Sequence, residues 1–204
     1  IIVYSADHGL VLGSHGLLVT QSVYEHSMKA PLFFSGKGIP AGSSDALAYL
    51  LDIPTTIWSL SETTAPAGVS GKDLSKLWTQ SDFEAVREDL LLAYEKYMRG
   101  LRWKNWKLIR YTHINKTQLF DLSLDPYELH DLSADTDHKT LVTELTNRMQ
   151  AAQSRFGDTQ ALSSEPPESA EIDLTGRERK PDAHQPAWIV KKYFDLEGWN
   201  WRDE

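Results

Sequence analysis

The chain contains no cysteine, which excludes disulfide bonds and thiolate metal ligands. It also has no apolar run near the roughly 20 residues that a membrane-spanning helix needs. Basic residues are outnumbered, 21 against 29 acidic residues, and a net charge of −8 argues against a nucleic-acid-binding protein. No signal-peptide pattern precedes Ile1, and we interpret the chain as part of a longer protein that we expect in the periplasm or outside the cell.

The composition, with 41% hydrophobic and 10% aromatic residues, is that of a globular protein. Residues 1–5 are apolar, rich in β-branched side chains and followed by glycines, which is typical of a strand buried on both faces of a parallel sheet. Residues 31–36 repeat that pattern. Between them residues 21–28 predict a short helix, and residues 52–60 predict a second one. The predicted fold class is therefore α/β, with residues 1–88 forming part of a parallel-sheet core.

The second half has a different character. Four short aromatic-rich runs separated by turns predict an antiparallel four-stranded sheet: residues 89–95, 97–103, 106–112 and 118–122. Residues 140–152 have apolar side chains at helical spacing and predict one helix on this sheet. Residues 89–157 thus predict a small α+β subdomain. Residues 158–204 predict a Pro-rich extended tail that contains one short helix at 188–194.

Asp7 and His8 stand directly after the first predicted strand, before Gly9, Gly13 and Gly16. Open α/β sheets bind ligands at the carboxyl ends of their strands. A carboxylate suits Ca²⁺ and Mg²⁺, an imidazole suits transition metals, and together they form half of a metal site. The alternative is a capping Asp beside a hydrogen-bonded His. Because neighbours on a straight strand point to opposite faces, a shared site requires the backbone to leave strand geometry here.

Several stretches, in this order and spacing, resemble the second half of a sulfatase of the alkaline phosphatase superfamily. The resemblance covers about residues 1–155. The stretches are Asp7-His8-Gly9-x-x-x-Gly13-x-His15-Gly16, residues 24–32, 36–42, 50–55, 71–74, 106–109, 119–122 and 125–129.

The resemblance implies hydrolysis of a sulfate ester, which we expect on a sulfated carbohydrate. It makes Asp7 a ligand of Ca²⁺, or alternatively Mg²⁺, with His8 as its companion, and it assigns His15 to shaping the loop. The remaining ligands and a formylglycine nucleophile, made from Cys or Ser, are expected in an N-terminal part. This chain has neither Cys-x-Pro-x-Arg nor Ser-x-Pro-x-Arg, so we expect it to be inactive by itself and to need that part.

One position departs from the family pattern. Thr20 stands where the family usually has a lysine that binds a sulfate oxygen, and a hydroxyl supplies no charge. Either Lys29 or Lys37 compensates, or activity is reduced. Lys29 is therefore a candidate substrate ligand, with a surface role as its alternative. His184 in the tail is a further candidate that could fold over a pocket, or lie in solvent.

Residues 96–110 contain six basic side chains and no acidic one. Such a run could draw a sulfated polyanion toward a cleft, or it could form the solvent faces of strands. Three functions stay open from the sequence: the C-terminal portion of a sulfatase, a phosphoesterase of the same superfamily, and a non-catalytic remnant or binding module.

Overall fold

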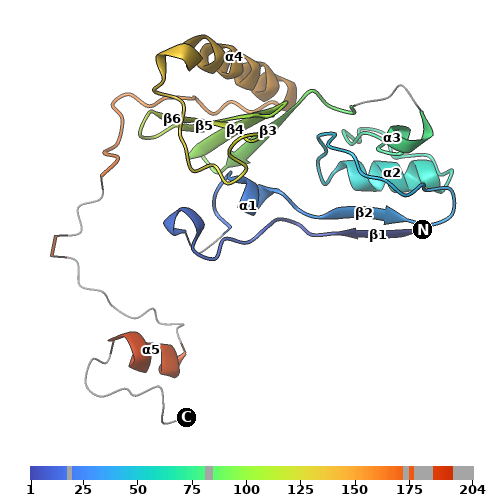
Figure 1. Ribbon diagram of the computed structural model, residues 1–204, viewed down its shortest axis with the longest axis horizontal. Coiled ribbons are helices and arrows are strands. Elements are labelled where there is room, and N and C mark those ends of the chain that lie inside the picture. Colours follow the sequence, from blue (N-terminus) through green and yellow to red (C-terminus); the bar gives the residue numbers. More distant parts are fainter. Residues whose placement is uncertain (18–19, 81–84, 172–174, 177–185, 195–204) are drawn as a thin grey trace. The chain divides into compact units, whose positions relative to one another are not determined.

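The computed structural model describes residues 1–17, 20–80, 85–171, 175–176 and 186–194 (Figure 1). Packing divides the chain into two units, residues 1–168 and residues 169–204. The helices and strands in chain order are β1 (Ile2–Ser5), α1 (Glu25–Met28), β2 (Leu32–Ser35), α2 (Asp52–Leu60), α3 (Lys76–Thr79), β3 (Asp89–Tyr94), β4 (Met98–Trp103), β5 (Trp106–Tyr111), β6 (Lys116–Asp121), α4 (Lys139–Phe156) and α5 (Ala187–Phe194).

Strands β3 to β6 form an antiparallel sheet in sequence order. Each strand pairs with the next along its whole length, and in β4 and β5, for example, Leu101 lies opposite Leu108. Helix α4 lies across one face of this sheet (Figure 1). It ends where Gly157 adopts a left-handed φ of 67°, which suits a residue without a Cβ. The predicted antiparallel sheet with a helix against it is confirmed.

The sheet face under α4 holds one apolar core. Leu101, Leu108 and Leu119 come from the three strands β4, β5 and β6, and they pack against Leu145 and Met149 of α4. None of these five side chains is more than 1% exposed. Because side chains alternate along a strand, every second residue points to this face. Burying each such side chain stabilises the fold by about 1.5–3 kcal/mol.

The opposite face of the sheet packs against the segment that leads into α1. Val23 and Tyr24 contact Ile109 and Phe120 in a second apolar core. Tyr24 has an extended backbone, and helix α1 begins only at Glu25. The predicted helix over 21–28 is therefore shorter than expected, because residues before Glu25 use an extended conformation to pack against the sheet.

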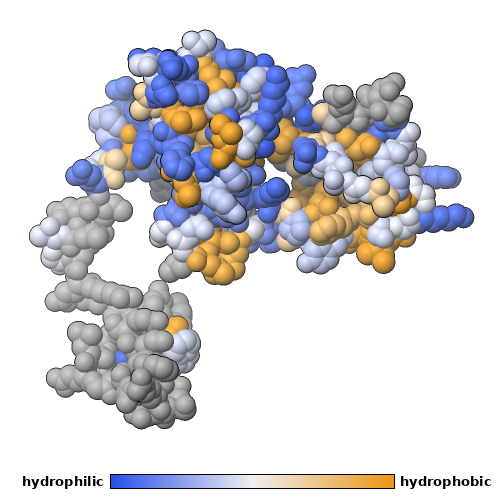
Figure 2. Space-filling view, viewed as in Figure 1, coloured by the Kyte–Doolittle hydropathy of each residue, from blue (hydrophilic) through white to orange (hydrophobic). Residues whose placement is uncertain are grey.

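Strands β1 and β2 form a separate two-stranded pair. They are antiparallel, with Ile2 opposite Ser35, whereas we expected both in a parallel sheet, and the described residues do not show that parallel part of the core. The side chains of Ile1, Ile2, Tyr4 and Phe33 are 61–72% exposed, so neither strand is buried on both faces. Figure 2 shows apolar surface, in orange, over this region. Apolar runs report strand formation, but they do not report strand direction.

Helix α2 begins at Asp52, where the sequence predicted a helix start. The Asp52 carboxylate is fully buried. It accepts hydrogen bonds from the main-chain N–H groups of Tyr49 and Lys72, at 2.7 Å each, and it pairs with the Arg87 guanidinium. This carboxylate therefore joins α2 to the segment before β3.

The predicted domain limits at residues 88 and 157 stay predictions. The packing unit extends to residue 168, since Asp158 pairs with Arg99 of β4 and Leu162 packs against the core under α4. The first residues of the predicted tail thus belong to the sheet layer. In the second unit, α5 corresponds to the helix predicted at 188–194.

Within the described part of the chain, no helix combines the length and apolarity needed to cross a membrane.

Candidate functional site

Asp7 and His8 follow β1 after one intervening residue. Nε2 of His8 lies 3.3 Å from Oδ2 of Asp7, and the main-chain N–H of His8 donates to Asp7 Oδ1 at 2.9 Å. The backbone has left strand geometry at this point, so the two side chains contact each other. This contact is what a shared site requires, and it also fits the alternative of an Asp beside a hydrogen-bonded His. Their role as metal ligands stays a prediction.

The donor set of this pair fits half of a metal site. The side chains of Asp7 and His8 are 82% and 47% exposed, so an ion can reach them. Nδ1 of His8 lies 2.7 Å from the carbonyl oxygen of Gly9, so both ring nitrogens face acceptor oxygens. When Nδ1 donates to this carbonyl oxygen, Nε2 is the nitrogen left for a metal. Ca²⁺ would need about four to six further oxygen ligands.

Gly9 fixes the loop that carries this pair. Its N–H donates to the carbonyl oxygen of Ser27 in α1 at 2.8 Å. A Cβ atom at Gly9 would lie 2.0 Å from the carbonyl oxygen of His26. Only glycine lets the two backbones approach this closely. The Asp7-His8 pair is therefore held against α1 by main-chain contacts.

His15 ties the same loop to residues that follow the sheet. Its ring stacks on Tyr24, with centroids 4.0 Å apart and planes 2° apart. Its Nε2 lies 3.1 Å from the carbonyl oxygen of Tyr127, which can only accept a hydrogen bond. These contacts agree with the expected role of His15 in shaping the loop.

A buried ion network lies beneath the loop. Nζ of Lys107, on β5, lies 3.0 Å from Oε1 of Glu25 and 2.9 Å from Oε1 of Glu128. The N–H of Glu25 donates to Oε2 of Glu128 at 2.7 Å. Burial raises the pKa of Glu128, and the Lys107 ammonium opposes that rise. The network therefore joins α1, the sheet and the turn after β6.

Several basic side chains of residues 96–110 form ion pairs and hydrogen bonds within the fold. Arg99 pairs with Asp158, and Arg110 donates to the carbonyl oxygens of Leu162 and Asn115. Arg99 is 6% exposed and Lys107 is fully buried. Burial lowers the pKa of Arg110. Arg99, Lys107 and Arg110 are thus bound within the fold, so neither a polyanion-attracting patch nor a solvent-facing strand describes them, whereas Lys96 and Lys104 are exposed.

The other predicted site residues are not joined to the Asp7-His8 pair. Among the described residues, neither Thr20 nor Lys29 forms a hydrogen bond or ion pair with Asp7 or His8. Thr20 accepts a hydrogen bond from the N–H of Ser22 through its carbonyl oxygen. Lys29 is exposed. His184 lies outside the described residues.

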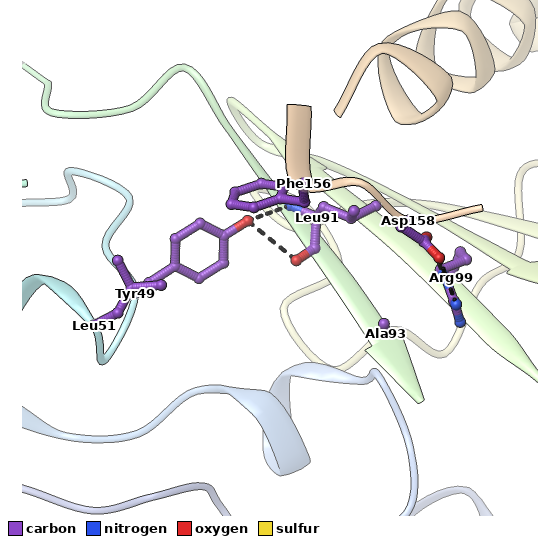
Figure 3. Close-up of a pocket in the computed structure, with 7 residues that line it drawn as sticks. All are labelled: Tyr49, Leu51, Leu91, Ala93, Arg99, Phe156 and Asp158. Atoms are coloured by element: carbon purple, nitrogen blue, oxygen red, sulfur yellow. Dashed lines mark hydrogen bonds and ion pairs between the residues drawn. The ribbon is translucent and has the colours of Figure 1, made fainter. Parts of the chain in front are cut away.

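A separate pocket of about 370 Å³ lies between β3 and the end of α4 (Figure 3). The Tyr49 hydroxyl accepts from the N–H of Leu91 at 2.6 Å and donates to its carbonyl oxygen at 3.1 Å. Phe156 packs edge-on to the Tyr49 ring, and Arg99 and Asp158 pair with each other. The polar groups that line this pocket already pair with one another. We therefore do not assign a ligand to it.

Sequence reasoning missed that two stretches carrying the resemblance, residues 24–32 and 125–129, meet in space. His26 comes from the first and Glu128 from the second. Together with His15 they place ligand atoms within 4.8 Å of one another. Each stretch contains a Tyr-Glu pair, Tyr24-Glu25 in the first and Tyr127-Glu128 in the second. The distance between the two stretches along the chain concealed their contact.

Comparisons with known proteins identify the family of this chain. The family described as N-sulphoglucosamine sulphohydrolase, C-terminal, matches residues 13–155. The ulvan-active sulfatase of Formosa agariphila is 28% identical over 170 residues, covering 78% of this chain and 33% of that protein. The N-acetylglucosamine-6-O-sulfatase of Bacteroides thetaiotaomicron is 26% identical over 171 residues, covering 78% and 31%. The chain thus spans about a third of the length of these relatives.

A solved structure of a protein with its substrate D-glucosamine-2-N,6-O-disulfate has the same fold, with a TM-score of 0.69 at 24% identity. The match covers 78% of this chain and 35% of that one. The fold and the matches define the class as alkaline-phosphatase-like sulfatases, which generally use a metal ion and a formylglycine. Within that class, the chain belongs to the N-sulphoglucosamine sulphohydrolase C-terminal family.

Proposed function

We propose that this chain supplies half of the metal site of a sulfatase that hydrolyses sulfate esters. The observation that carries the proposal is the contact between Asp7 and His8, 3.3 Å apart and exposed at the end of β1. It lies in a chain of which residues 13–155 match a sulfatase family. The buried network of Lys107, Glu25 and Glu128 fixes α1, against which the Asp7-His8 loop rests.

In this proposal Asp7 and His8 hold Ca²⁺, with Mg²⁺ as the alternative. When bound, the metal neutralises charge that develops on the sulfuryl oxygens. Asp7 supplies a carboxylate oxygen. His8 can bind the ion through Nε2 and keep its Nδ1 hydrogen bond to Gly9, which fixes the ring orientation. The formylglycine nucleophile is supplied by another part of the protein.

The proposed substrate is a sulfated sugar. The name of one relative specifies N-acetylglucosamine-6-O-sulfatase, and the substrate in one structure of this fold is a disulfated glucosamine. Thr20 and Lys29 are proposed to contact the sulfate group, as is His184. Since Thr20 is neutral, it can donate one hydrogen bond to a sulfate oxygen but adds no charge.

The first experiment expresses residues 1–204 both alone and behind the coding sequence found upstream of Ile1. The extended protein is expected to hydrolyse a sulfated glucosamine or an aryl sulfate, and the 1–204 chain is expected to be inactive. In the extended protein, Asp7→Ala should lower kcat/KM by about 100-fold or more, as for other losses of transition-state charge stabilisation. The matched control is Asp45→Ala, which removes an exposed carboxylate.

The outcomes separate the three functions. Hydrolysis of an aryl phosphate in preference to the sulfate ester would support the phosphoesterase. An extended protein without turnover on either ester would support the binding module. Equal losses in Asp7→Ala and Asp45→Ala would contradict the metal role of Asp7. Within an active protein, Thr20→Lys is expected to lower KM for the sulfate ester, and an unchanged KM would remove Thr20 from the substrate site.

A further inference from the structure

A second group of ligating side chains lies apart from the Asp7-His8 contact. His15 belongs to the loop after β1, His26 to α1, and Glu128 to the turn after β6. Their ligand atoms all lie within 4.8 Å of one another. We propose that His15, His26 and Glu128 form a binding site for a divalent transition-metal ion of the Zn²⁺ class.

Both imidazoles have a nitrogen available for a metal. Nε2 of His26 is buried and has no hydrogen-bond partner among the described residues, which is costly unless something outside them satisfies it. Nε2 of His15 faces the Tyr127 carbonyl oxygen and therefore carries the proton, which leaves the lone pair on Nδ1. A ligating histidine usually donates its other N–H to a carbonyl or carboxylate in this way, which fixes its orientation.

The surroundings of His26 are compatible with metal binding. Burial lowers the pKa of His26, and the nearby His15 and Lys107 lower it further. Neutral imidazole is the form that binds metals, so this environment does not oppose binding. A buried neutral nitrogen without a donor partner has few alternatives to an ion or a water molecule.

Glu128 supplies the third donor. Its side chain is 1% exposed, and its backbone has a left-handed φ of 57°. The N–H of Glu25 holds one carboxylate oxygen, and Lys107 lies 2.9 Å from the other. A metal must share this carboxylate with Lys107, which weakens binding. Glu25 offsets part of this repulsion because it shares the same ammonium.

The donor types decide the class of ion. Two imidazole nitrogens and one carboxylate favour Zn²⁺, Co²⁺, Ni²⁺ or Cu²⁺ over Ca²⁺ and Mg²⁺, which prefer oxygen ligands. Three protein ligands with one open position also occur in zinc sites. Bonds of about 2.0–2.1 Å at tetrahedral angles space donors about 3.3 Å apart, so the donor atoms must close by at most roughly 1.5 Å.

The test is a titration of the 1–204 chain, without a histidine tag, with Zn²⁺ by calorimetry and with Co²⁺ by visible absorption. One ion per chain is expected, with a Co²⁺ band typical of nitrogen and oxygen ligands. His26→Ala should weaken binding by about tenfold or more, since even the loss of an outer-shell partner costs 10–100-fold. The matched control is His130→Ala, which removes an exposed histidine and should leave binding unchanged.

Further variants separate this site from the Asp7-His8 pair. Glu128→Gln keeps the side-chain shape and should also weaken Zn²⁺ binding, whereas Asp7→Ala should not. Circular dichroism and urea unfolding check that each variant is folded. The proposal is overturned if no saturable binding occurs, if His26→Ala binds like the wild type, or if His130→Ala or Asp7→Ala weakens binding as much. None of these outcomes bears on sulfatase activity, which the extended protein reports separately.

Discussion

The antiparallel sheet and the β1–β2 pair both carry large apolar side chains, yet they differ in what covers those side chains. The sheet has α4 on one face and the α1 segment on the other, and its central leucines are at most 1% exposed. In the β1–β2 pair, Ile2 and Phe33 are 72% and 61% exposed. The sheet region is therefore stabilised within this chain, while the strand that leads to Asp7 has apolar surface that the described residues leave uncovered.

This difference teaches that the chemistry and the stability lie in different regions. The Asp7-His8 contact is on the less covered region, and the buried contacts that hold its loop come from the more stable one. The loop depends on α1 through Gly9, and α1 depends on the sheet through Lys107. Substitutions in the sheet should therefore reach the candidate site, although none of those residues touches Asp7.

The largest expected effect concerns Lys107. Lys107→Met removes the only cation within ion-pair distance of Glu128 among the described residues, and it leaves the buried Glu128 carboxylate uncompensated, whereas Glu25 keeps Arg102 nearby. Breaking such a buried pair costs about 3–5 kcal/mol of unfolding free energy. Lys29→Met, on an exposed position beside α1, should cost less than about 0.5 kcal/mol. Urea unfolding measures both, and similar losses would contradict the comparison.

A slightly smaller effect is expected for apolar truncation. Leu108→Ala opens a cavity in the core under α4 and should cost about 2–5 kcal/mol. Phe33→Ala removes a larger side chain from an exposed position and should change the unfolding free energy of the 1–204 chain by about 0.5 kcal/mol or less. A Phe33→Ala loss as large as that of Leu108→Ala would show that the β1–β2 pair is covered in solution.

The link between the two regions is tested at Gly9. Gly9→Ala places a Cβ 2.0 Å from the His26 carbonyl oxygen, so the loop or α1 must move, at a cost of about 1–3 kcal/mol. Gly42→Ala meets no atom within 4 Å and is the matched control. Thermal unfolding compares the two variants. A neutral Gly9→Ala would mean that the loop does not rest on α1.

The smallest effect is a pH dependence at the edge of the sheet region. Hydrogen bonds from Arg99 hold the pKa of Asp158 well below its usual range. A carboxyl group with a depressed folded-state pKa contributes stability above its unfolded pKa of about 3.9, and that stability is lost as the pH falls toward the folded value. Asp158→Asn should therefore cost about 1–3 kcal/mol at pH 7. The difference from the wild type should shrink below about pH 4, whereas Asp45→Asn should change little at either pH.

The sequence predicted the antiparallel sheet well, because its turns and alternation are local signals. It did not predict how β1 and β2 pair, because strand direction depends on distant parts of the chain. The contact between Asp7 and His8 followed from their position at a strand end. The roles of Arg99 and Lys107 could not be predicted, since their partners, Asp158 and Glu25, lie 59 and 82 residues away along the chain.

The two charged residues on opposite faces of β5 have a consequence for folding specificity. Lys107 points toward Glu25 and Glu128, while Arg110 reaches the loop around Leu162 on the other face. A slip of one residue in the pairing of β5 would exchange its two faces. Lys107 would then lie under Leu145 and Met149 without a carboxylate partner. These two cations thus destabilise a sheet in which β5 is paired out of register. The sequence of β5 therefore favours the correct strand alignment.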